Sequence, residues 1–348
     1  MVHLWVRAEQ RENERRVGLT PHGAEALLEA GFRVTVEESP NRIIPIEGYA
    51  AAGCEIAAQG SWRDAPVDAL IYGLKELPDD GTALPHRHIM FGHAYKGQSE
   101  AERFLARFAQ SGGALYDLEF LVDEQGRRVA AFGYWAGFVG AALTFKTWVA
   151  QQNGDICGEV REWEEQEALV SEIEAELDAC ESRPRALIVG ALGRVGTGAA
   201  DFCEAMGIEP TRWDIAETAS GGPFPEILHR EIFLNCVLAG PHTPVFVPES
   251  ALAAPRALTA IGDIACDPTS DFNPIPVYDE ATDWDEPALR VADDPVLDVM
   301  AIDNLPSLLP LEASEDFAGQ MLPHLLTLGA IEGGVWGRAA STFKEHSA

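Results

Sequence analysis

The sequence of 348 residues is poor in positive charge and in long apolar runs. Its 25 lysines and arginines face 56 aspartates and glutamates, which gives a formal net charge of −31. Such a chain repels phosphate backbones and anionic lipid heads, so we expect neither nucleic acid nor a membrane surface as a partner. No apolar run approaches the roughly 18 residues of a membrane span. The first residues lack the features of a signal peptide, which predicts a cytoplasmic protein.

Paired cysteines and metal-ligand spacing are missing as well. The six cysteines form no Cys-x-x-Cys pair, so we expect reduced thiols rather than a disulfide framework. His86 and His88 lie two residues apart, but no neighbouring cysteine or histidine completes a zinc set. We therefore predict no metal site.

Lysine is rare among the basic residues. Only Lys75, Lys96, Lys146 and Lys344 occur, and the other basic residues are arginines. An ammonium group loses its proton when it is desolvated, whereas a guanidinium does not. Lysines in apolar surroundings are therefore candidates for acid–base chemistry.

The length corresponds to about two domains of roughly 150 residues. In the first part, strand-like runs alternate with helical patterns, which favours a parallel sheet with crossover helices. We predict strands at residues 4–6, 34–36, 69–72 and 89–91, and helices at residues 21–30 and 100–110.

The second part begins with a nearly uncharged stretch at residues 134–150. Its small residues predict a buried, closely packed helix that leaves the first domain. Residues 159–178 are acidic but repeat Leu169, Ile173 and Leu177 on one edge, which predicts a solvated helix. Further strands are predicted at residues 185–189, 210–213, 232–234 and 258–261.

These patterns predict an α/β protein of two Rossmann-like, doubly wound domains with a cleft between them. Residues 1–134 and 310–348 would form the first domain, and residues 135–309 the second. The final segment would pack back on the first domain through Phe317, Leu322, Leu325 and Trp336. Two connections suit a hinge closure.

A glycine-rich turn follows the strand at residues 185–189. Gly190, Gly193 and Gly196 have the spacing G-x-x-G-x-x-G, which departs from the common G-x-G-x-x-G. Asp214 ends the next predicted strand, where an acid binds the adenosine ribose and disfavours a 2′-phosphate. The sequence therefore predicts a dinucleotide site that prefers NAD to NADP.

Lys75, His93 and Lys96 follow two predicted strands of the first domain. In a parallel sheet, the residues beyond the strand C-termini line the ligand crevice. We expect the three side chains to gather on one rim.

At this point the sequence resembles the lysine-forming saccharopine dehydrogenases, within the alanine dehydrogenase and transhydrogenase superfamily. The resemblance rests on segments that occur in order over most of the chain. They are residues 15–21 (RRVGLTP), 73–76 (GLKE), 93–96 (HAYK), 115–120 (LYDLEF), 126–133 (GRRVAAFG), 190–194 (GALGR), 213–215 (WDI), 221–224 (GGPF) and 302–310 (IDNLPSLLP).

The resemblance implies that NAD oxidises saccharopine at its secondary amine and that the imine is hydrolysed to L-lysine and 2-oxoglutarate. Lys75 and His93 match the acid–base pair of the family. Hydride leaves readily only when the amine is unprotonated, and a lysine beside positive groups in a cleft can have its pKa lowered enough to act as the base. Glu76 would oppose this effect, so we expect its carboxylate to point elsewhere or to pair separately.

The resemblance also implies the binding residues. The implied substrate contacts are Arg16, Lys75, Lys96, Glu119, Arg128, Phe132, Ala265, Cys266 and Asp267. The implied cofactor contacts are Arg127, Gly190, Gly193, Arg194, Asp214, Thr218, Leu238, Ile264, Ile302, Asp303, Asn304 and Leu305.

Three positions depart from the family pattern. Val195 replaces a loop cysteine that pairs, in some fungal-type relatives, with the cysteine matching Cys236, so that redox switch is not expected. Ala219-Ser220 replaces an arginine, and Leu238 replaces an aromatic residue. These two changes leave the cofactor affinity open.

Two alternatives remain open from the sequence. Another amino-acid dehydrogenase of the superfamily, such as one acting on alanine, would share the nucleotide loop and the Lys/His pair. A catalytically silent NAD-binding regulatory protein would bind cofactor without turnover. The sequence fixes neither the direction of the reaction in lysine metabolism nor the oligomeric state, for which we expect a monomer.

Overall fold

The computed structural model describes residues 1–11, 13–95 and 99–347, and the chain forms two compact units. Unit 1 comprises Met1–Ala131 and Pro310–Ala348, and unit 2 comprises Phe132–Leu309. The chain therefore passes between the units twice, after Ala131 and after Leu309. The sequence placed these crossing points near residues 134 and 309.

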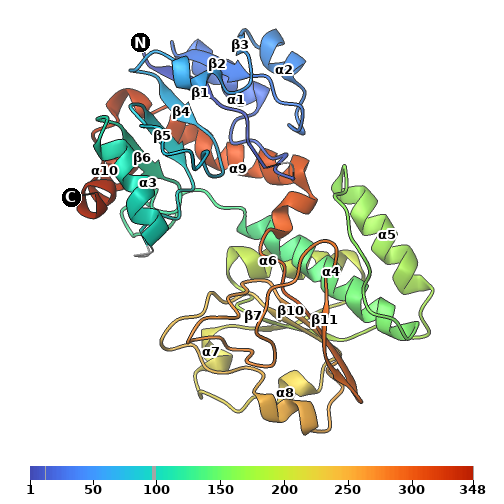
Figure 1. Ribbon diagram of the computed structural model, residues 1–348. Coiled ribbons are helices and arrows are strands. Elements are labelled where there is room, and N and C mark those ends of the chain that lie inside the picture. Colours follow the sequence, from blue (N-terminus) through green and yellow to red (C-terminus); the bar gives the residue numbers. More distant parts are fainter. Residues whose placement is uncertain (12, 96–98, 348) are drawn as a thin grey trace. The chain divides into compact units, whose positions relative to one another are not determined.

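Unit 1 is built on a parallel sheet of six strands (Figure 1). Its order is β3-β2-β1-β4-β5-β6, which is the strand order of a Rossmann fold. The direction of winding reverses between β1 and β4, so the ligand crevice of such a sheet lies beyond their carboxyl ends. The strands are β1 (His3–Val6), β2 (Arg33–Glu37), β3 (Glu55–Ala57), β4 (Leu70–Tyr72), β5 (Arg87–Met90) and β6 (Ala114–Asp117).

Helices from both ends of the chain cover this sheet. Thr20 begins the first of them by accepting the N–H of Gly23 at 3.2 Å, and Gly31 follows its end with a φ of 85°. Phe317 and Trp336, from the final segment, are fully buried. The ring centroid of Phe317 lies 5.9 Å from that of Phe91, and the ring centroid of Trp336 lies 6.1 Å from that of Tyr116. The helices of unit 1 are α1 (Pro21–Glu29), α2 (Ile46–Ala51), α3 (Ser99–Ala109), α9 (Pro310–Leu325) and α10 (Gly334–His346), with short 3-10 turns at Ser61–Asp64 and Leu328–Ala330.

Glu37 ends β2 as a fully buried carboxylate. It accepts hydrogen bonds from the indole N–H of Trp5 and from the backbone N–H groups of Ala8, Gly60 and Trp62, at 2.5 to 3.0 Å. A buried charge is tolerated only when donors surround it in this way. Glu37 therefore joins β1, β2 and the turn after β3.

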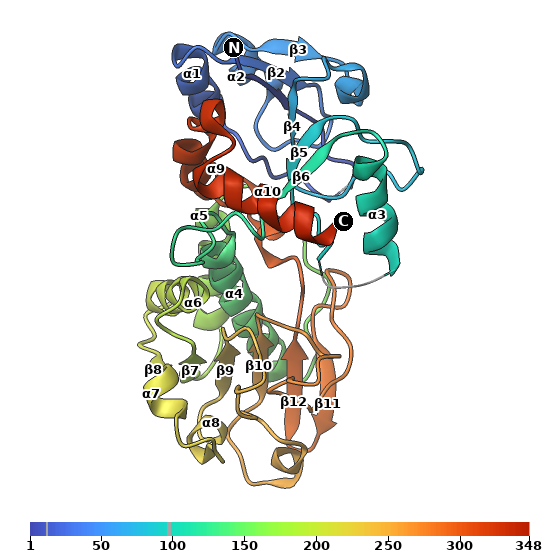
Figure 2. The ribbon, with the colours of Figure 1, turned by 90° about the vertical axis from the view of Figure 1, so that its left-hand side faces the viewer.

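Unit 2 also has a six-stranded sheet, in the order β11-β12-β10-β9-β7-β8 (Figure 2). Only β11 runs antiparallel to its neighbour. The winding reverses between β7 and β9, which pair in parallel from Ala186–Ile232 onward. The strands are β7 (Ala186–Val189), β8 (Thr211–Trp213), β9 (Ile232–Asn235), β10 (Ala260–Asp263), β11 (Leu289–Asp293) and β12 (Val296–Met300).

The first and third helices of unit 2 pack with almost no side chain between them. A Cβ atom on Gly137 would lie 1.8 Å from the carbonyl oxygen of Val195, and one on Gly198 would lie 1.9 Å from that of Tyr134. The close packing predicted from the small residues is thus confirmed. The helices of unit 2 are α4 (Gly133–Gln152), α5 (Gln166–Asp178), α6 (Arg194–Ala205), α7 (Ile215–Thr218) and α8 (Pro225–Leu228), with 3-10 turns at Glu249–Ala253 and Leu305–Leu308.

Both sheets confirm the predicted α/β class with two Rossmann-like units. Two elements were predicted to begin two or more residues earlier than they do. The helix predicted from residue 159 begins at Gln166, because the N–H groups of Val160 and Trp163 bond to the carbonyls of Trp284 and Leu308 instead. The strand predicted from residue 258 begins at Ala260, because the N–H of Leu258 bonds to Leu228, which precedes β9.

The apolar edge of α5 is as predicted, with Leu169, Ile173 and Leu177 fully buried. Although α4 is long and largely uncharged, no helix in the described part of the chain is apolar enough over a sufficient length to cross a membrane.

Candidate active site

Lys75 and His93 lie on two neighbouring loops of unit 1. Lys75 follows β4, and His93 follows β5, which pairs with β4 in parallel. The loops stay together beyond the strands, because the N–H of Phe91 donates to the carbonyl of Leu74 at 3.0 Å. Both residues therefore lie at the carboxyl edge of the sheet, where the sequence placed them. Lys96, the third residue predicted on this rim, lies outside the described residues.

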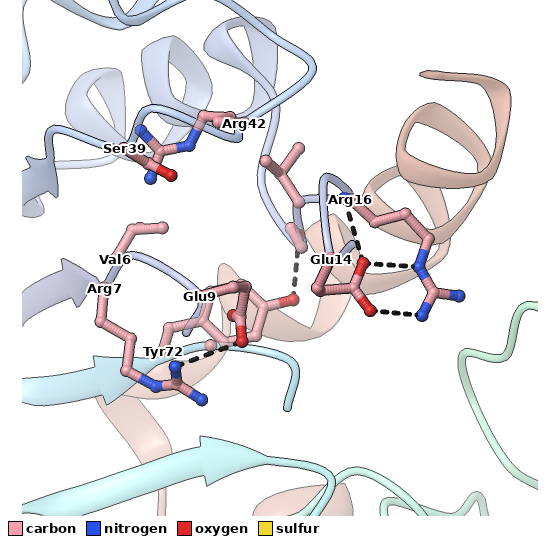
Figure 3. Close-up of a pocket in the computed structure, with 11 residues that line it drawn as sticks. Val6, Arg7, Glu9, Glu14, Arg16, Ser39, Arg42 and Tyr72 are labelled. Carbon is pink, nitrogen blue, oxygen red and sulfur yellow. Dashed lines mark hydrogen bonds and ion pairs between the residues drawn. The ribbon is translucent and has the colours of Figure 1, made fainter. Parts of the chain in front are cut away.

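The peptide group of Lys75 is held by a buried ion pair (Figure 3). Glu9 accepts the backbone N–H groups of Leu74 and Lys75 at 2.7 and 3.0 Å. Arg7 pairs with Glu9 at 3.2 Å and donates a second hydrogen bond to the carbonyl of Lys75. Glu76 points away to an exposed ion pair with Arg11 at 2.5 Å, which confirms its predicted separate pairing.

Arg16 forms a second buried ion pair, with Glu14. Its Nε and Nη2 donate to the two carboxylate oxygens at 2.8 and 2.6 Å, a bidentate arrangement. Burial raises the pKa of Glu14, but the charge and hydrogen bonds of Arg16, together with the charge of Lys75, bring it below its ordinary value. The charges of Arg16 and Lys75, two of the predicted substrate-binding cations, therefore both act on Glu14.

A small cavity separates these two ion pairs. It is lined by Arg7, Glu9, Glu14, Arg16 and Tyr72 among others, and its volume of about 20 Å³ holds roughly one water molecule. It is too small for an amino-acid substrate. Arg42, a half-buried arginine of this wall, donates to the carbonyl of Glu37 at 2.7 Å.

His93 lies in a charged cluster with two other predicted site residues. Its Nδ1 is 3.4 Å from a carboxylate oxygen of Glu119, and the other oxygen accepts a hydrogen bond from Arg128 at 3.1 Å. The side chain of His93 is 59% exposed, and its backbone has a φ of 47°, a conformation that is uncommon outside glycine. A protonated imidazole here would gain an ion pair with Glu119.

Asp117 is a buried acid beneath this cluster that the sequence did not single out. It ends β6, is fully buried, and accepts the N–H of Glu119 at 2.9 Å. Burial raises the pKa of Asp117 to about 6, although hydrogen bonds from the N–H groups of Glu119 and Gly92 oppose the rise. Its place directly after an apolar β-type run is the only signal that could have drawn attention to it.

In unit 2, glycines shape the turn between β7 and α6. Gly190 has a φ of 84°, and a Cβ atom on Gly196 would lie 2.1 Å from the carbonyl oxygen of Gly190. Gly193 is the N-cap residue of α6. Because it has no side chain, it does not cover the first N–H groups of that helix. Such a helix start binds phosphate groups. The turn therefore fits a pyrophosphate despite its unusual spacing.

Asp214 follows β8 and borders an apolar pocket of about 500 Å³. One carboxylate oxygen accepts the N–H of Leu192 at 3.0 Å, and the other caps α7 through Ile215 at 2.9 Å. Four of the predicted cofactor residues line this one pocket, namely Gly190, Asp214, Thr218 and Leu238. Its size and its exposed Leu238 and Ile215 suit the flat apolar ring of an adenine.

The remaining predicted cofactor residues of unit 2 differ in their exposure. Arg194 and Asp303 are exposed and Asn304 is half-buried, whereas Ile264, Ile302 and Leu305 are buried. A Cβ atom on Gly140 would lie 2.6 Å from Ile264 and 3.1 Å from Leu305, so these two side chains pack against α4.

The predicted substrate residues Ala265, Cys266 and Asp267 follow β10 with increasing exposure. Burial raises the pKa of the Cys266 thiol to about 12, so it stays protonated. Phe132 lies just before α4, and Arg127 is an exposed residue of unit 1 that pairs with Asp123 at 2.9 Å.

The cysteines and the core histidine His88 show no sign of disulfide or metal chemistry. All six cysteines are free thiols. His88 is a core side chain that packs edge-on against Trp62 and Phe108, and burial holds its pKa well below the ordinary value. Among the described residues, no group of three or more His, Cys, Asp or Glu side chains is placed to hold a metal ion.

Comparison with known proteins identifies the family. Residues 5–139 match the model of the N-terminal domain of alanine dehydrogenase and PNT. The chain is 44% identical to the saccharopine dehydrogenase (NAD+, L-lysine-forming) of Candida albicans, over 100% of the chain and 97% of the relative. It is 43% identical to the protein of that name from Neurospora crassa, over 98% and 95%. This chain belongs to the lysine-forming saccharopine dehydrogenase family.

Two solved structures with 16% sequence identity share the fold of this family member. L-alanine dehydrogenase has a TM-score of 0.68 over 99% of the chain and 94% of its own length. A transhydrogenase from Sinorhizobium meliloti has a TM-score of 0.65 over 96% and 97%. The expected membership of the alanine dehydrogenase and transhydrogenase superfamily is therefore confirmed by both sequence and fold.

Proposed function

We propose that this chain is an NAD-dependent oxidoreductase that converts saccharopine to L-lysine and 2-oxoglutarate, reversibly. The observation that carries the proposal is an identity of 42–44%, over nearly the whole chain, to six proteins named for this activity. The geometry of the two units supports it, because unit 1 holds cations and titratable groups and unit 2 holds a nucleotide-type turn.

Lys75 serves as the base that removes the proton from the secondary amine of saccharopine. Its peptide is fixed at the carboxyl edge of the unit 1 sheet, and its side chain interacts electrostatically with Glu14. Oxidation leaves an imine carbon between the two halves of the substrate. Water then adds to that carbon, and its protons must be moved before the carbon–nitrogen bond breaks.

His93 moves those protons. Its exposed ring can meet the substrate, and its Nδ1 lies 3.4 Å from a carboxylate oxygen of Glu119. Arg128 contacts the other oxygen of Glu119, so the histidine and an arginine proposed to bind a substrate carboxylate share one acid. Arg16 and Lys96 would hold the other carboxylates, with Glu119 and Phe132 as further contacts.

NAD, when bound, accepts the hydride. We propose that unit 2 holds it by the turn at Gly190, Gly193 and Arg194, by Asp214 at the ribose and by the pocket at Thr218 and Leu238. The segments at residues 264–267 and 302–305, and Arg127, would supply further contacts to cofactor or substrate. Because Asp214 is a carboxylate at the ribose position, NAD is preferred to NADP.

An absorbance assay of reduced cofactor tests this function. The purified chain with saccharopine and NAD should form NADH, whereas alanine with NAD should not. With Lys75→Met, kcat should fall by about 10²- to 10⁴-fold, as expected for loss of a general base. Retained binding of NADH by the variant, followed by fluorescence, would show that the fold is intact.

Three results would refute the proposal. They are turnover of alanine in place of saccharopine, cofactor binding without turnover of either, and a Lys75→Met variant as active as the wild type. The monomeric state and the cytoplasmic location remain predictions, which gel filtration and cell fractionation would test.

A further inference from the structure

The backbone of Lys75 is fixed from both sides by one ion pair. Its N–H donates to Glu9 at 3.0 Å, and its carbonyl accepts from Arg7. Glu9 also accepts the preceding N–H, of Leu74, at 2.7 Å. The two charged side chains join each other at 3.2 Å. The N–H of Leu74 and both backbone groups of Lys75 thus bind a single Arg–Glu pair.

The ion pair of Arg7 and Glu9 is buried in unit 1. The side chains of Arg7 and Glu9 are 1% and 9% exposed. Arg7 follows β1, which is paired with β4, so the pair and the lysine loop leave adjacent strands at the switch point of the sheet. Taking two charges out of water costs several kcal/mol per ion unless many hydrogen bonds compensate. Here the loop of Lys75 supplies those bonds.

Gly73 makes room for the arrangement. A Cβ atom at that position would lie 2.4 Å from Nε and 2.5 Å from Cζ of Arg7. The guanidinium therefore passes directly over the backbone of residue 73 to reach the carbonyl of Lys75. A side chain at residue 73 would force it away from both of its partners.

A lysine side chain has four rotatable carbon–carbon bonds, so its amine is aimed only as well as its Cα is fixed. Misplacement of a reacting group by about 1 Å can cost about 100-fold in rate. We propose that Arg7 and Glu9 are positioning residues that fix the Lys75 peptide and so aim its amine at the substrate. This inference rests on the function proposed above, in which Lys75 is the base.

The test compares Glu9→Gln with Glu231→Gln. Glu231 is a matched control that belongs to unit 2, because it also pairs with an arginine, Arg185, and accepts a backbone N–H at 2.7 Å. Steady-state kinetics with saccharopine and NAD, the unfolding temperature and amide hydrogen exchange are measured on the full chain.

We expect Glu9→Gln to lower kcat about 10-fold with KM changed less than twofold, and to speed amide exchange at Leu74 and Lys75. Glu231→Gln should leave kcat within twofold of the wild type. The proposal is overturned if Glu9→Gln keeps the wild-type kcat. It is also overturned if both variants lose kcat in proportion to their unfolding temperatures, which would indicate a general loss of stability.

The failure of this inference is distinguishable from failure of the proposed function. If Lys75→Met is as active as the wild type, the proposed function fails. The amide exchange of Leu74 and Lys75 still reports whether Glu9 holds the loop. If Lys75→Met is inactive and Glu9→Gln is fully active, only the positioning role is lost.

Discussion

At the scale of single residues, the candidate cations of unit 1 were found from the sequence, whereas Glu119 was the only one of their acidic partners named there. Lys75, Arg16 and Arg128 stand out because they belong to recognisable segments in a chain with few basic residues. Glu9, Glu14 and Asp117 are three of 56 acids, and nothing local distinguishes an acid that is buried by the tertiary fold. Which acid pairs with which cation depends on how β1, β4, β5 and β6 are arranged in the fold. No pattern along the sequence predicts this.

Asp117 gives the first prediction at this scale. Its pKa rises from an ordinary 3.8 to about 6 in the folded state, so the unfolded chain binds fewer protons between those values. The stabilising contribution of the protonated carboxyl is therefore complete below about pH 4 and is lost as the pH rises through about 6. A change of about two pKa units corresponds to roughly 3 kcal/mol.

Urea unfolding of the wild type and of Asp117→Asn at pH 4.5 and pH 7 measures this effect. The residue at position 117 cannot ionise in the variant. The unfolding free energy of the variant minus that of the wild type should therefore be roughly 1–3 kcal/mol higher at pH 7 than at pH 4.5. Asp271→Asn is the control, because Asp271 is exposed. A difference that stays constant with pH would contradict the assignment.

At the scale of elements, apolar runs located most of the strands at the centre of each sheet. β1, β4, β7 and β9 are buried runs within one or two residues of their predicted positions. β3, β6, β11 and β12 were not predicted. β3 and β11 are edge strands without a fully buried residue, whereas β12 is a buried strand inside the sheet of unit 2. Residues 159–165 read as helix because of their composition, whereas tertiary hydrogen bonds hold them extended.

The contact between α4 and α6 yields a prediction for an element. In Gly198→Ala, the new Cβ would lie 1.9 Å from the carbonyl oxygen of Tyr134, so the helices must separate. We expect a loss of about 1–3 kcal/mol in unfolding free energy, measured by urea denaturation. Gly319→Ala in α9 is the matched control, because no atom lies within 4 Å of its added methyl group.

The control should be neutral or up to about 1 kcal/mol more stable than the wild type, since alanine favours a helix. Equal effects of the two substitutions would indicate that helix propensity, and not the close approach of α4, sets the result.

At the scale of the whole molecule, the net charge of −31 acts on every part of the fold. Self-repulsion opposes the compact state at neutral pH, and salt screens it because the Debye length shrinks to about 3 Å at 1 M. We expect the unfolding temperature at pH 7 to rise by several degrees between about 10 mM and 1 M KCl.

The same titration near the isoelectric point of about 4.5 is the control. Positive and negative charges balance there, so the unfolding temperature should respond far less to KCl. An equal response at both pH values would mean that ion-specific effects, and not the excess of acid, cause the rise.

In each sheet the winding reverses beside its first strand, yet the acid at the end of the second strand has opposite roles in the two units. Asp214 borders an open pocket, whereas Glu37 is saturated by indole and peptide donors of its own unit. A sugar hydroxyl approaching Glu37 would find no acceptor left for it. We therefore expect one chain to bind a single dinucleotide, in unit 2, which leaves the crevice of unit 1 for the other reactant.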